Sequence, residues 1–286
     1  MKPISALLNI LELDQVKEGL FRGVSKDIGS PSVFGGQVLS QALYAATRTV
    51  DPARLVHSLH GYFILAGDMS IPIDYEVDII RDGRSFTTRR VVARQHGKAI
   101  FIMAASFQIE EEGMDHQVEM LNVPPPESLR SLIEWARDLP DSVPIKRFGL
   151  FAEDSPIDVR PVENINPVSP ARRPPFRHVW FRANGDLAEA SQSAHRYILA
   201  YASDFNLLIT ALLPHGISLF TPGLQIASLD HALWFHRPFR ADEWLLYALD
   251  SPSASGARGF TRGSVFNREG RLVASVAQEG LMRMRK

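Results

Sequence analysis

The sequence predicts an α+β fold built from two similar halves, each with a curved antiparallel sheet wrapped around one long central helix. One observation is that residues 35–50 are apolar on nearly every side when drawn as a helix, which is typical of a helix buried inside a protein. A second observation is that this helix precedes several short runs of apolar residues separated by glycine turns, as in antiparallel strands. A helix that is apolar all round needs cover on every side, and a curled sheet provides it.

The third observation is that this order of elements occurs twice. The pair Tyr62-Phe63 corresponds to Trp234-Phe235, and "SFTTRR" from residue 85 corresponds to "GFTRGS" from residue 259. A glycine-turn hairpin, "RQHGKAIFIMAA" from residue 94, corresponds to "NREGRLVASVAQ" from residue 267. The lag is about 172 residues throughout, drifting by one or two. A sheet curled around a central helix is the hotdog arrangement, so the duplication predicts a tandem double hotdog whose two sheets are joined.

Proline marks the connection between the halves. Of the 19 prolines, 11 lie between Pro124 and Pro175, in turn and extended-chain sequences. One short helix is expected among them, in "SLRSLIEWARDL" at residues 128–139. We therefore expect an N-terminal hotdog over residues 1–115, a Pro-rich linker over residues 116–156, and a C-terminal hotdog over residues 157–286.

The composition narrows the classes of function. The 286 residues carry a net charge of −1 without a basic run, which gives no electrostatic reason to expect a nucleic-acid partner. Without cysteine the chain has no disulfide, thiolate metal site or cysteine nucleophile. No histidine spacing suggests a metal site, and we expect no metal and no cofactor.

The apolar segments do not suggest a membrane protein. Charged and polar residues interrupt the N-terminal apolar stretch, which therefore does not read as a signal peptide. The uncharged run Leu207–Leu229 contains two prolines and two glycines, so it is not expected to be one membrane-spanning helix. We expect a cytoplasmic protein without a membrane partner.

The stretch "SLDHALWFHRPF", from Ser228, places a serine, an aspartate and a histidine within four residues. It reads as a strand, and side chains on a strand alternate between its two faces. Ser228 and Asp230 would then share one face while His231 lies on the other. This predicts that Ser228 and His231 point apart and cannot form a nucleophile–base pair.

Two other polar residues stand among apolar neighbours. Asp204 lies in "YILAYASDFNLLITALL", and it could either cap a new helix or serve as a functional carboxylate. Gln278 ends an apolar strand face, where it could be a plain strand-end residue or part of a site. The matching positions in the first half are Gly36 and Ala105. A polar set in one half only predicts one active site per chain.

A series of motifs occurs in a fixed order across residues 6–283, namely "EGLFRG", "VFGGQVLSQAL", "LVHSLHGYF", "RDGRSFTTRRV", "VRPVE", "YASDFNLL", "LDHALWFHRPF", "SGARGF" and "VASVAQEGLMR". In these motifs the chain resembles the acyl-CoA thioesterase II family. The resemblance implies the double-hotdog fold and hydrolysis of fatty acyl-CoA to a fatty acid and coenzyme A. It also implies a homo-oligomer, a dimer or a tetramer.

The resemblance assigns roles to three residues. Asp204, Ser228 and Gln278 match the family's Asp, its Thr or Ser, and its Gln, which hold a hydrolytic water. Many bacterial members have threonine where this chain has Ser228, and either hydroxyl can donate and accept. We expect Asp204 to act as the general base of this water.

Substrate contacts are expected at four further residues. Arg258 and Arg262 are candidates for the coenzyme A phosphates, although arginines on a hairpin are commonly just solvated. Trp234 and Phe235 are candidates for the wall of an acyl tunnel, with core packing as the alternative. Two other functions stay open: a hotdog hydratase or dehydratase acting on acyl-CoA, and an acyl-CoA-binding protein without turnover. The hydratase would need His231 beside the site.

Overall fold

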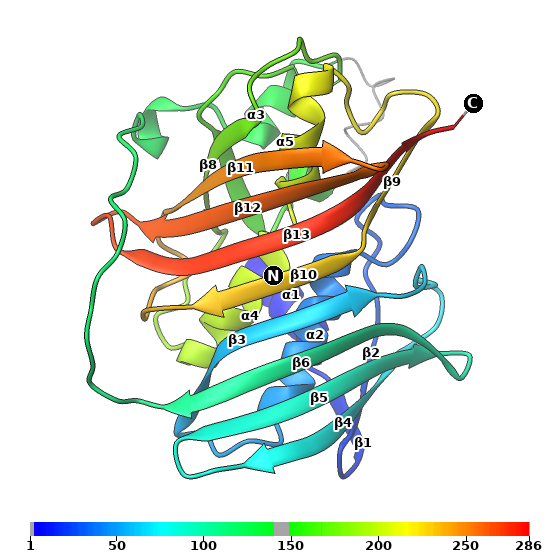
Figure 1. Ribbon diagram of the computed structural model, residues 1–286, viewed down its shortest axis with the longest axis vertical. Coiled ribbons are helices and arrows are strands. Elements are labelled where there is room, and N and C mark those ends of the chain that lie inside the picture. The colour runs from blue at the N-terminus through cyan, green and yellow to red at the C-terminus, as the bar shows by residue number, and fades with distance from the viewer. Residues whose placement is uncertain (1–2, 140–148, 167, 286) are drawn as a thin grey trace.

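The computed structural model describes residues 3–139, 149–166 and 168–285, and in this part of the chain it confirms the α+β double hotdog (Figure 1). A single antiparallel sheet of 13 strands runs through both halves, in the order β1-β2-β4-β5-β6-β3-β10-β13-β12-β11-β8-β7, with β9 paired to β13. The first half contributes β1 (Asp14–Lys17), β2 (Leu20–Gly23), β3 (Arg54–Phe63), β4 (Ile73–Asp82), β5 (Phe86–Gln95) and β6 (Lys98–Ile109). The second half contributes β7 (Ile157–Pro161), β8 (Phe176–Ala183), β9 (Leu224–Ser228), β10 (Asp230–Phe235), β11 (Leu245–Ser255), β12 (Arg258–Asn267) and β13 (Leu272–Met284).

The two halves are joined where β3 pairs with β10. The pairing is antiparallel and runs from Asp230 opposite Tyr62 to Trp234 opposite Ser58. Figure 1 shows the result, in which the cyan and green strands of the first half continue directly into the yellow and red strands of the second. The predicted joining of the two sheets is confirmed, and it places the ends of β3 and β10 beside each other.

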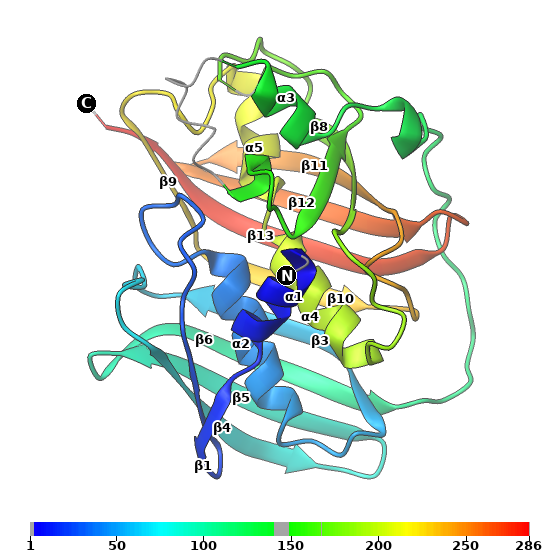
Figure 2. The same ribbon diagram turned by 180° about the vertical axis from the view of Figure 1, so that it is seen from behind.

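Helices cover one face of this sheet, as Figure 2 shows from behind. They are α1 (Pro3–Leu11), α2 (Gly35–Thr47), α3 (Leu132–Arg137), α4 (Gln192–Ser203) and α5 (Leu207–Leu212). The predicted central helix of the first half is confirmed, because ten of the 13 residues of α2 are buried. It packs against β3, β4, β5 and β6 on one side and against α4 on the other. The N-terminal helix α1 also belongs to the core, with Ile4, Leu7 and Leu11 buried.

The helix of the second half is broken in the middle. It runs as α4 to Ser203, and α5 begins at Leu207 after Asn206 adopts a left-handed backbone with φ 74°. The segment Gln192–His215 has the length and hydropathy to cross a membrane, but 72% of its most apolar window is buried inside the protein. Such burial is what the central helix of this fold requires. The residues at the break, Asp204, Phe205 and Asn206, are buried or half-buried.

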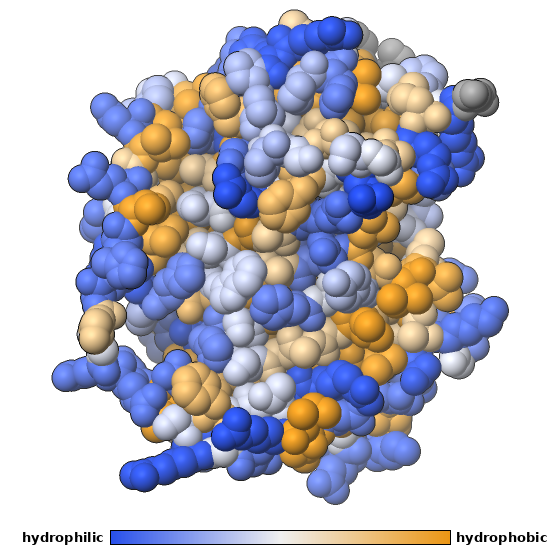
Figure 3. Space-filling model, in the orientation of Figure 1, coloured by the Kyte–Doolittle hydropathy of each residue, from blue (hydrophilic) through white to orange (hydrophobic). Residues whose placement is uncertain are grey.

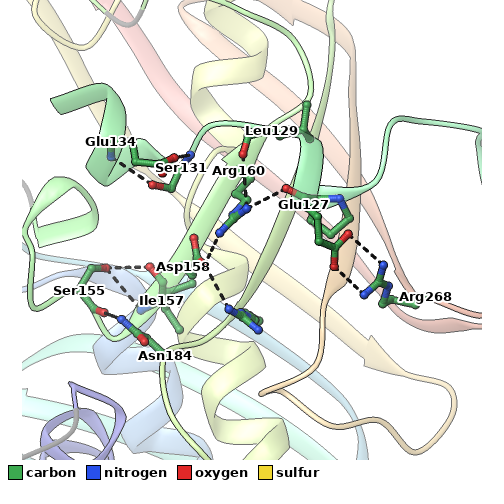
Figure 4. A network of polar contacts seen from close by, with 12 residues as sticks. Glu127, Leu129, Ser131, Glu134, Ser155, Ile157, Asp158, Arg160, Asn184 and Arg268 are labelled. Carbon is green, nitrogen blue, oxygen red and sulfur yellow. Dashed lines mark hydrogen bonds and ion pairs between the residues drawn. The ribbon is translucent and has the colours of Figure 1, made fainter. Parts of the chain in front are cut away.

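The connection between the halves is held against the second half (Figure 4). Arg160 of β7 donates to the carbonyls of Pro126 and Leu129, and Arg268 of the β12–β13 turn pairs with Glu127. The expected short helix is α3, which begins with a capping box formed by Ser131 and Glu134. The helix-free face of the sheet is shown in Figure 3, where apolar side chains are scattered among polar ones.

Candidate active site

Asp204 lies at the break between the two helices of the second half. It is the residue after α4, and its carboxylate is 5% exposed. The helix-capping alternative is wrong, because α5 has Asn206 at its N-cap and no side chain caps it. One helix therefore ends and another begins at a buried carboxylate that does not cap the second helix.

Three groups hydrogen-bond to the Asp204 carboxylate. The backbone N–H of Gly36, at the start of α2, donates to it, and so do the side chains of Ser228 and Gln278, the Ser228 hydroxyl over 3.4 Å. Gly36 belongs to the first half, so the site spans both halves. Burial raises the pKa of Asp204 above its ordinary value, while the nearby His231 and these hydrogen bonds act to lower it.

Gln278 and Ser228 come from neighbouring strands, β13 and β9. The Gln278 amide nitrogen donates to the Ser228 hydroxyl over 2.9 Å. On its other side, the Gln278 carbonyl oxygen lies 2.6 Å from Nδ1 of His231. The structure thus brings together all three residues that the sequence singled out, Asp204, Ser228 and Gln278, and adds His231 to them.

The directions of these hydrogen bonds follow from Asp204. An ionised carboxylate can only accept, so Ser228 donates to it and accepts from the Gln278 NH₂ group. The Gln278 carbonyl then faces His231, and Nδ1 must carry a hydrogen. Burial lowers the pKa of His231, and its Nε2 lies 2.9 Å from the hydroxyl of Ser203, which itself donates to the carbonyl of Ala200. His231, Gln278 and Ser228 thus each donate toward Asp204.

The predicted geometry of "SLDHALWF" was wrong in one respect: Ser228 and His231 point to the same side of the sheet. Four residue steps from Ser228 to Ala232 are matched on β13 by only three, from Gly280 to Ala277. The extra residue is a β-bulge at Leu229, which reverses the alternation of side chains. The bulge is held on both edges, since Leu229 donates to the carbonyl of Glu279 and accepts from the N–H of Phe63.

The serine–histidine pair nevertheless does not form. Both ring nitrogens of His231 are already engaged, Nε2 with Ser203 and Nδ1 with Gln278. His231 is 1% exposed, and its Nδ1 lies 3.9 Å from Oδ1 of Asp204, with no hydrogen bond to Ser228. This motif is therefore not a catalytic triad, as the sequence predicted. The reason is that both nitrogens of His231 are engaged, and not that Ser228 and His231 point to opposite faces.

A large cavity opens onto the carboxylate. It has a volume of about 1310 Å³, and Asp204, Ser228 and Gln278 are part of its wall. Apolar side chains from α2, α5, the end of β3 and the loops around them make up much of the rest, including Val38, Phe63, Phe205, Leu208 and Ile209. Gly35 keeps the cavity open next to the carboxylate, because a β-carbon there would lie 2.7 Å from Oδ2 of Asp204.

The four expected substrate contacts lie elsewhere. Arg258 pairs with Glu279 and Arg262 with Asp250, both exposed on the helix-free side of β12. Phe235 is buried under the guanidinium of Arg196, and Trp234 packs edge-on against His60. Strand alternation turns Arg258, Arg262 and Trp234 to the helix-free face, whereas Phe235 lies on the buried face of β10 within the core. The described wall of the cavity includes none of the four.

Sequence reasoning missed the backbone donor Gly36 and the supporting residues His231 and Ser203. The paired glycines of "FGGQV" were a usable signal for the first, since glycine permits close approach of other groups to the backbone. A β-carbon on Gly36 would lie 2.4 Å from the carbonyl oxygen of Tyr201. The role of His231 was hidden by the bulge, which strand alternation cannot foresee.

Comparison with known proteins gives consistent results along the whole chain. Residues 148–281 match the family described as acyl-CoA thioesterase, and residues 23–108 match the acyl-CoA thioesterase N-terminal domain. The chain is 39% identical to acyl-CoA thioesterase 2 of Haemophilus influenzae, over 98% of each protein. It is 42% identical to human acyl-coenzyme A thioesterase 8, over 96% of this chain and 88% of that protein.

A solved structure gives the same picture in three dimensions. The crystal structure of an acyl-CoA thioesterase II from Mycobacterium marinum superposes with a TM-score of 0.81 at 42% identity. The alignment covers 98% of this chain and 99% of that one. The match therefore extends over both halves and the connection between them.

Proposed function

Since this chain belongs to the acyl-CoA thioesterase family, we propose that it hydrolyses fatty acyl-CoA to a fatty acid and coenzyme A through a water held by Asp204, Ser228 and Gln278. The observation that carries this mechanism is the buried carboxylate at the wall of a large, partly apolar cavity. A cavity of this kind suits an acyl chain, and a buried carboxylate is costly to keep without a function.

Asp204 accepts a proton from the water as it attacks the thioester carbonyl. The raised pKa makes the ionised Asp204 a stronger base than an exposed carboxylate. Ser228 and Gln278, which already donate toward Asp204, orient the water. The start of α2 lies at the same place, and its N–H groups and positive dipole end favour the oxyanion that develops.

The arrangement disfavours the hydratase and dehydratase alternative. Such chemistry needs an acid–base pair that reaches the acyl chain, and His231 was the expected partner. The His231 ring is buried with both nitrogens engaged, and it is not part of the described cavity wall. A binding protein without turnover would have no use for a buried base at the cavity wall.

The test is release of free thiol from acyl-CoA substrates of short to long chain. The wild type should release coenzyme A, and Asp204→Asn should fold and lose most of this activity, by about 10²- to 10⁴-fold. Asp250→Asn is the matched control, since Asp250 is an exposed carboxylate that pairs with Arg262 on the other face of the sheet. Thiol release by Asp204→Asn at the wild-type rate would eliminate the proposed mechanism.

We further propose that the protein works in the cytoplasm as a homo-oligomer, a dimer or a tetramer, with acyl-CoA as its substrate partner. The burial of Gln192–His215 supports a role away from the membrane, because that apolar segment is used inside the fold. Light scattering on the purified protein gives its mass, and a monomer at micromolar concentration would contradict this proposal.

A further inference from the structure

Arg177 is a buried cation that faces the same cavity as Asp204. It lies on β8, where the buried face also carries Val179 and Phe181. Its side chain is only 8% exposed, and it is part of the cavity wall. A guanidinium on the core face of a strand is unusual, since this face otherwise takes apolar residues.

The guanidinium of Arg177 has no hydrogen bond or ion pair with any residue in the described part of the chain. Its Nε is sealed from solvent and has no partner. Glu163 lies close enough to act through its charge, but its carboxylate is already used by His178, accepting from the backbone N–H and bonding Nδ1. Burial lowers the pKa of Arg177 to about 10, so it still carries its charge near pH 7.

Other arginines near the cavity differ from Arg177. Arg130 donates to Asp138 and to the carbonyl of Glu134, and Arg285 donates to Gln225. Arg196 is also buried and leaves Nε and one further nitrogen without a hydrogen bond, but it stacks over the ring of Phe235. Arg196 is not part of the cavity wall. Arg177 therefore combines burial, an unpartnered guanidinium and a position in the cavity.

We propose that Arg177 binds an anionic group of the substrate, through phosphate or carboxylate oxygens, at a subsite within the cavity. The inference rests on the proposed function, which supplies the substrate. A buried charge without a partner destabilises the free protein, and a bound anion would remove this cost. The planar guanidinium presents paired N–H donors that fit the two oxygens of a carboxylate or phosphate.

Acyl-CoA substrates offer two sources for such oxygens. One is a phosphate of the coenzyme A portion, which every acyl-CoA carries, and the other is the terminal carboxylate of a dicarboxylic acyl-CoA. Three substrates of equal acyl length separate them: hexanoyl-CoA, hexanoyl-pantetheine without the nucleotide phosphates, and the mono-CoA thioester of adipic acid. The wild type, Arg177→Met and Arg177→Lys are compared by kcat/KM on all three, with Arg196→Met as the control for loss of a buried arginine.

Each source of oxygens predicts the loss of a different substrate preference. If Arg177 binds a phosphate, Arg177→Met reduces the preference for hexanoyl-CoA over hexanoyl-pantetheine by about 10-fold or more. If it binds a carboxylate, the preference for the adipic thioester over hexanoyl-CoA falls by a similar factor. Arg177→Lys retains part of either preference, and Arg196→Met retains all of it. Two unchanged preferences in Arg177→Met would refute the subsite.

Two further measurements test the subsite without relying on hydrolysis. Calorimetry with coenzyme A and with adipate measures binding directly, so loss of affinity in Arg177→Met supports the subsite even if the wild type releases no thiol. Equal affinities of the wild type and Arg177→Met for both probes would overturn it. The melting temperature of ligand-free Arg177→Met should equal or exceed that of the wild type, because an uncompensated charge is removed. A marked fall would instead assign Arg177 a structural role.

Discussion

Nδ1 of His231 lies 2.6 Å from the carbonyl oxygen of Gln278, and this contact fixes which end of the amide faces the site. An amide can be turned by 180° with little change in shape, which would present a carbonyl oxygen to Ser228 in place of the NH₂ group. By donating to the carbonyl, His231 holds the NH₂ group toward Ser228 and the water.

We therefore expect His231→Leu to lower kcat by about 10- to 100-fold with little change in KM. The substitution leaves the buried Gln278 carbonyl unpaired, which costs about 1–3 kcal/mol, and His231 itself is not part of the described cavity wall. The side-chain nitrogen of asparagine can take the place of Nδ1, so His231→Asn should recover part of kcat. Steady-state kinetics with acyl-CoA checks this, and equal rates for the Leu and Asn variants would contradict the role.

Ser228 is expected to act through its hydroxyl and not as a nucleophile. Ser228→Ala should lower kcat more than it changes KM, because the hydroxyl bridges Gln278 and Asp204. Ser228→Thr keeps the hydroxyl and should retain most of the activity. Mass spectrometry under turnover should detect no acylated Ser228. A trapped acyl-serine, or an unchanged kcat in Ser228→Ala, would remove the assigned role.

The rate should depend on the ionisation of Asp204. Since the base must be ionised, kcat falls as the pH falls through the pKa of Asp204, which burial raises. The acid limb of the pH–rate profile should consequently lie above the range of an exposed aspartate. A stopped-flow profile on the wild type measures it. An acid limb at or below the ordinary aspartate value of 3.8 would contradict the raised pKa.

The same shift makes a prediction about stability. A carboxyl group whose pKa is raised in the folded protein binds protons more tightly there than in the unfolded chain. The wild type therefore loses stability as the pH rises from the unfolded pKa through the folded one. Asp204→Asn lacks this loss and should melt above the wild type near pH 7, with the difference shrinking toward acid pH. A lower melting temperature near pH 7 would show that hydrogen bonds to the carboxylate outweigh its burial.

Replacing Gly35 by alanine should leave the fold intact but remove most of the activity. Alanine is favoured over glycine in a helix by about 1 kcal/mol. At this position, however, the β-carbon would lie 2.7 Å from Oδ2 of Asp204 and 3.0 Å from the ring of Phe63. Gly35→Ala should keep its circular dichroism spectrum and lose most of its turnover. Gly113→Ala is the control, since nothing lies within 4 Å of its β-carbon.

Much of the fold could be predicted because it rests on repeated local patterns. The apolar circumference of α2 and the two glycine-turn hairpins each specify their own element. Asp204 and Gln278 could be noticed because each is a polar residue among apolar neighbours. The bulge at Leu229 could not be predicted, since it depends on the register between three strands and not on any residue in its own sequence.

The positions of the four expected substrate contacts relative to the cavity could not be predicted for a related reason. Arg258 and Arg262 stand in a motif that suggested anion binding, but alternation along β12 turns both outward to acidic partners. Arg177 drew no attention, because "PPFRHVWF" looks like an ordinary strand with one charged residue. Only the fold shows that this residue points inward.

The hydrogen bond from Gly36 to Asp204 crosses from one half of the chain to the other. On the proposed mechanism neither repeat could carry out the reaction by itself, because the proposed base comes from one copy and a hydrogen-bond donor to it comes from the other. If the two halves were separated into different proteins, activity would be lost on this mechanism. The surface of each half away from the site could still change by mutation. Turnover then measures how accurately the repeats are aligned, and a substitution far from Asp204 that shifts one repeat by a fraction of an ångström would slow the enzyme before it unfolds it.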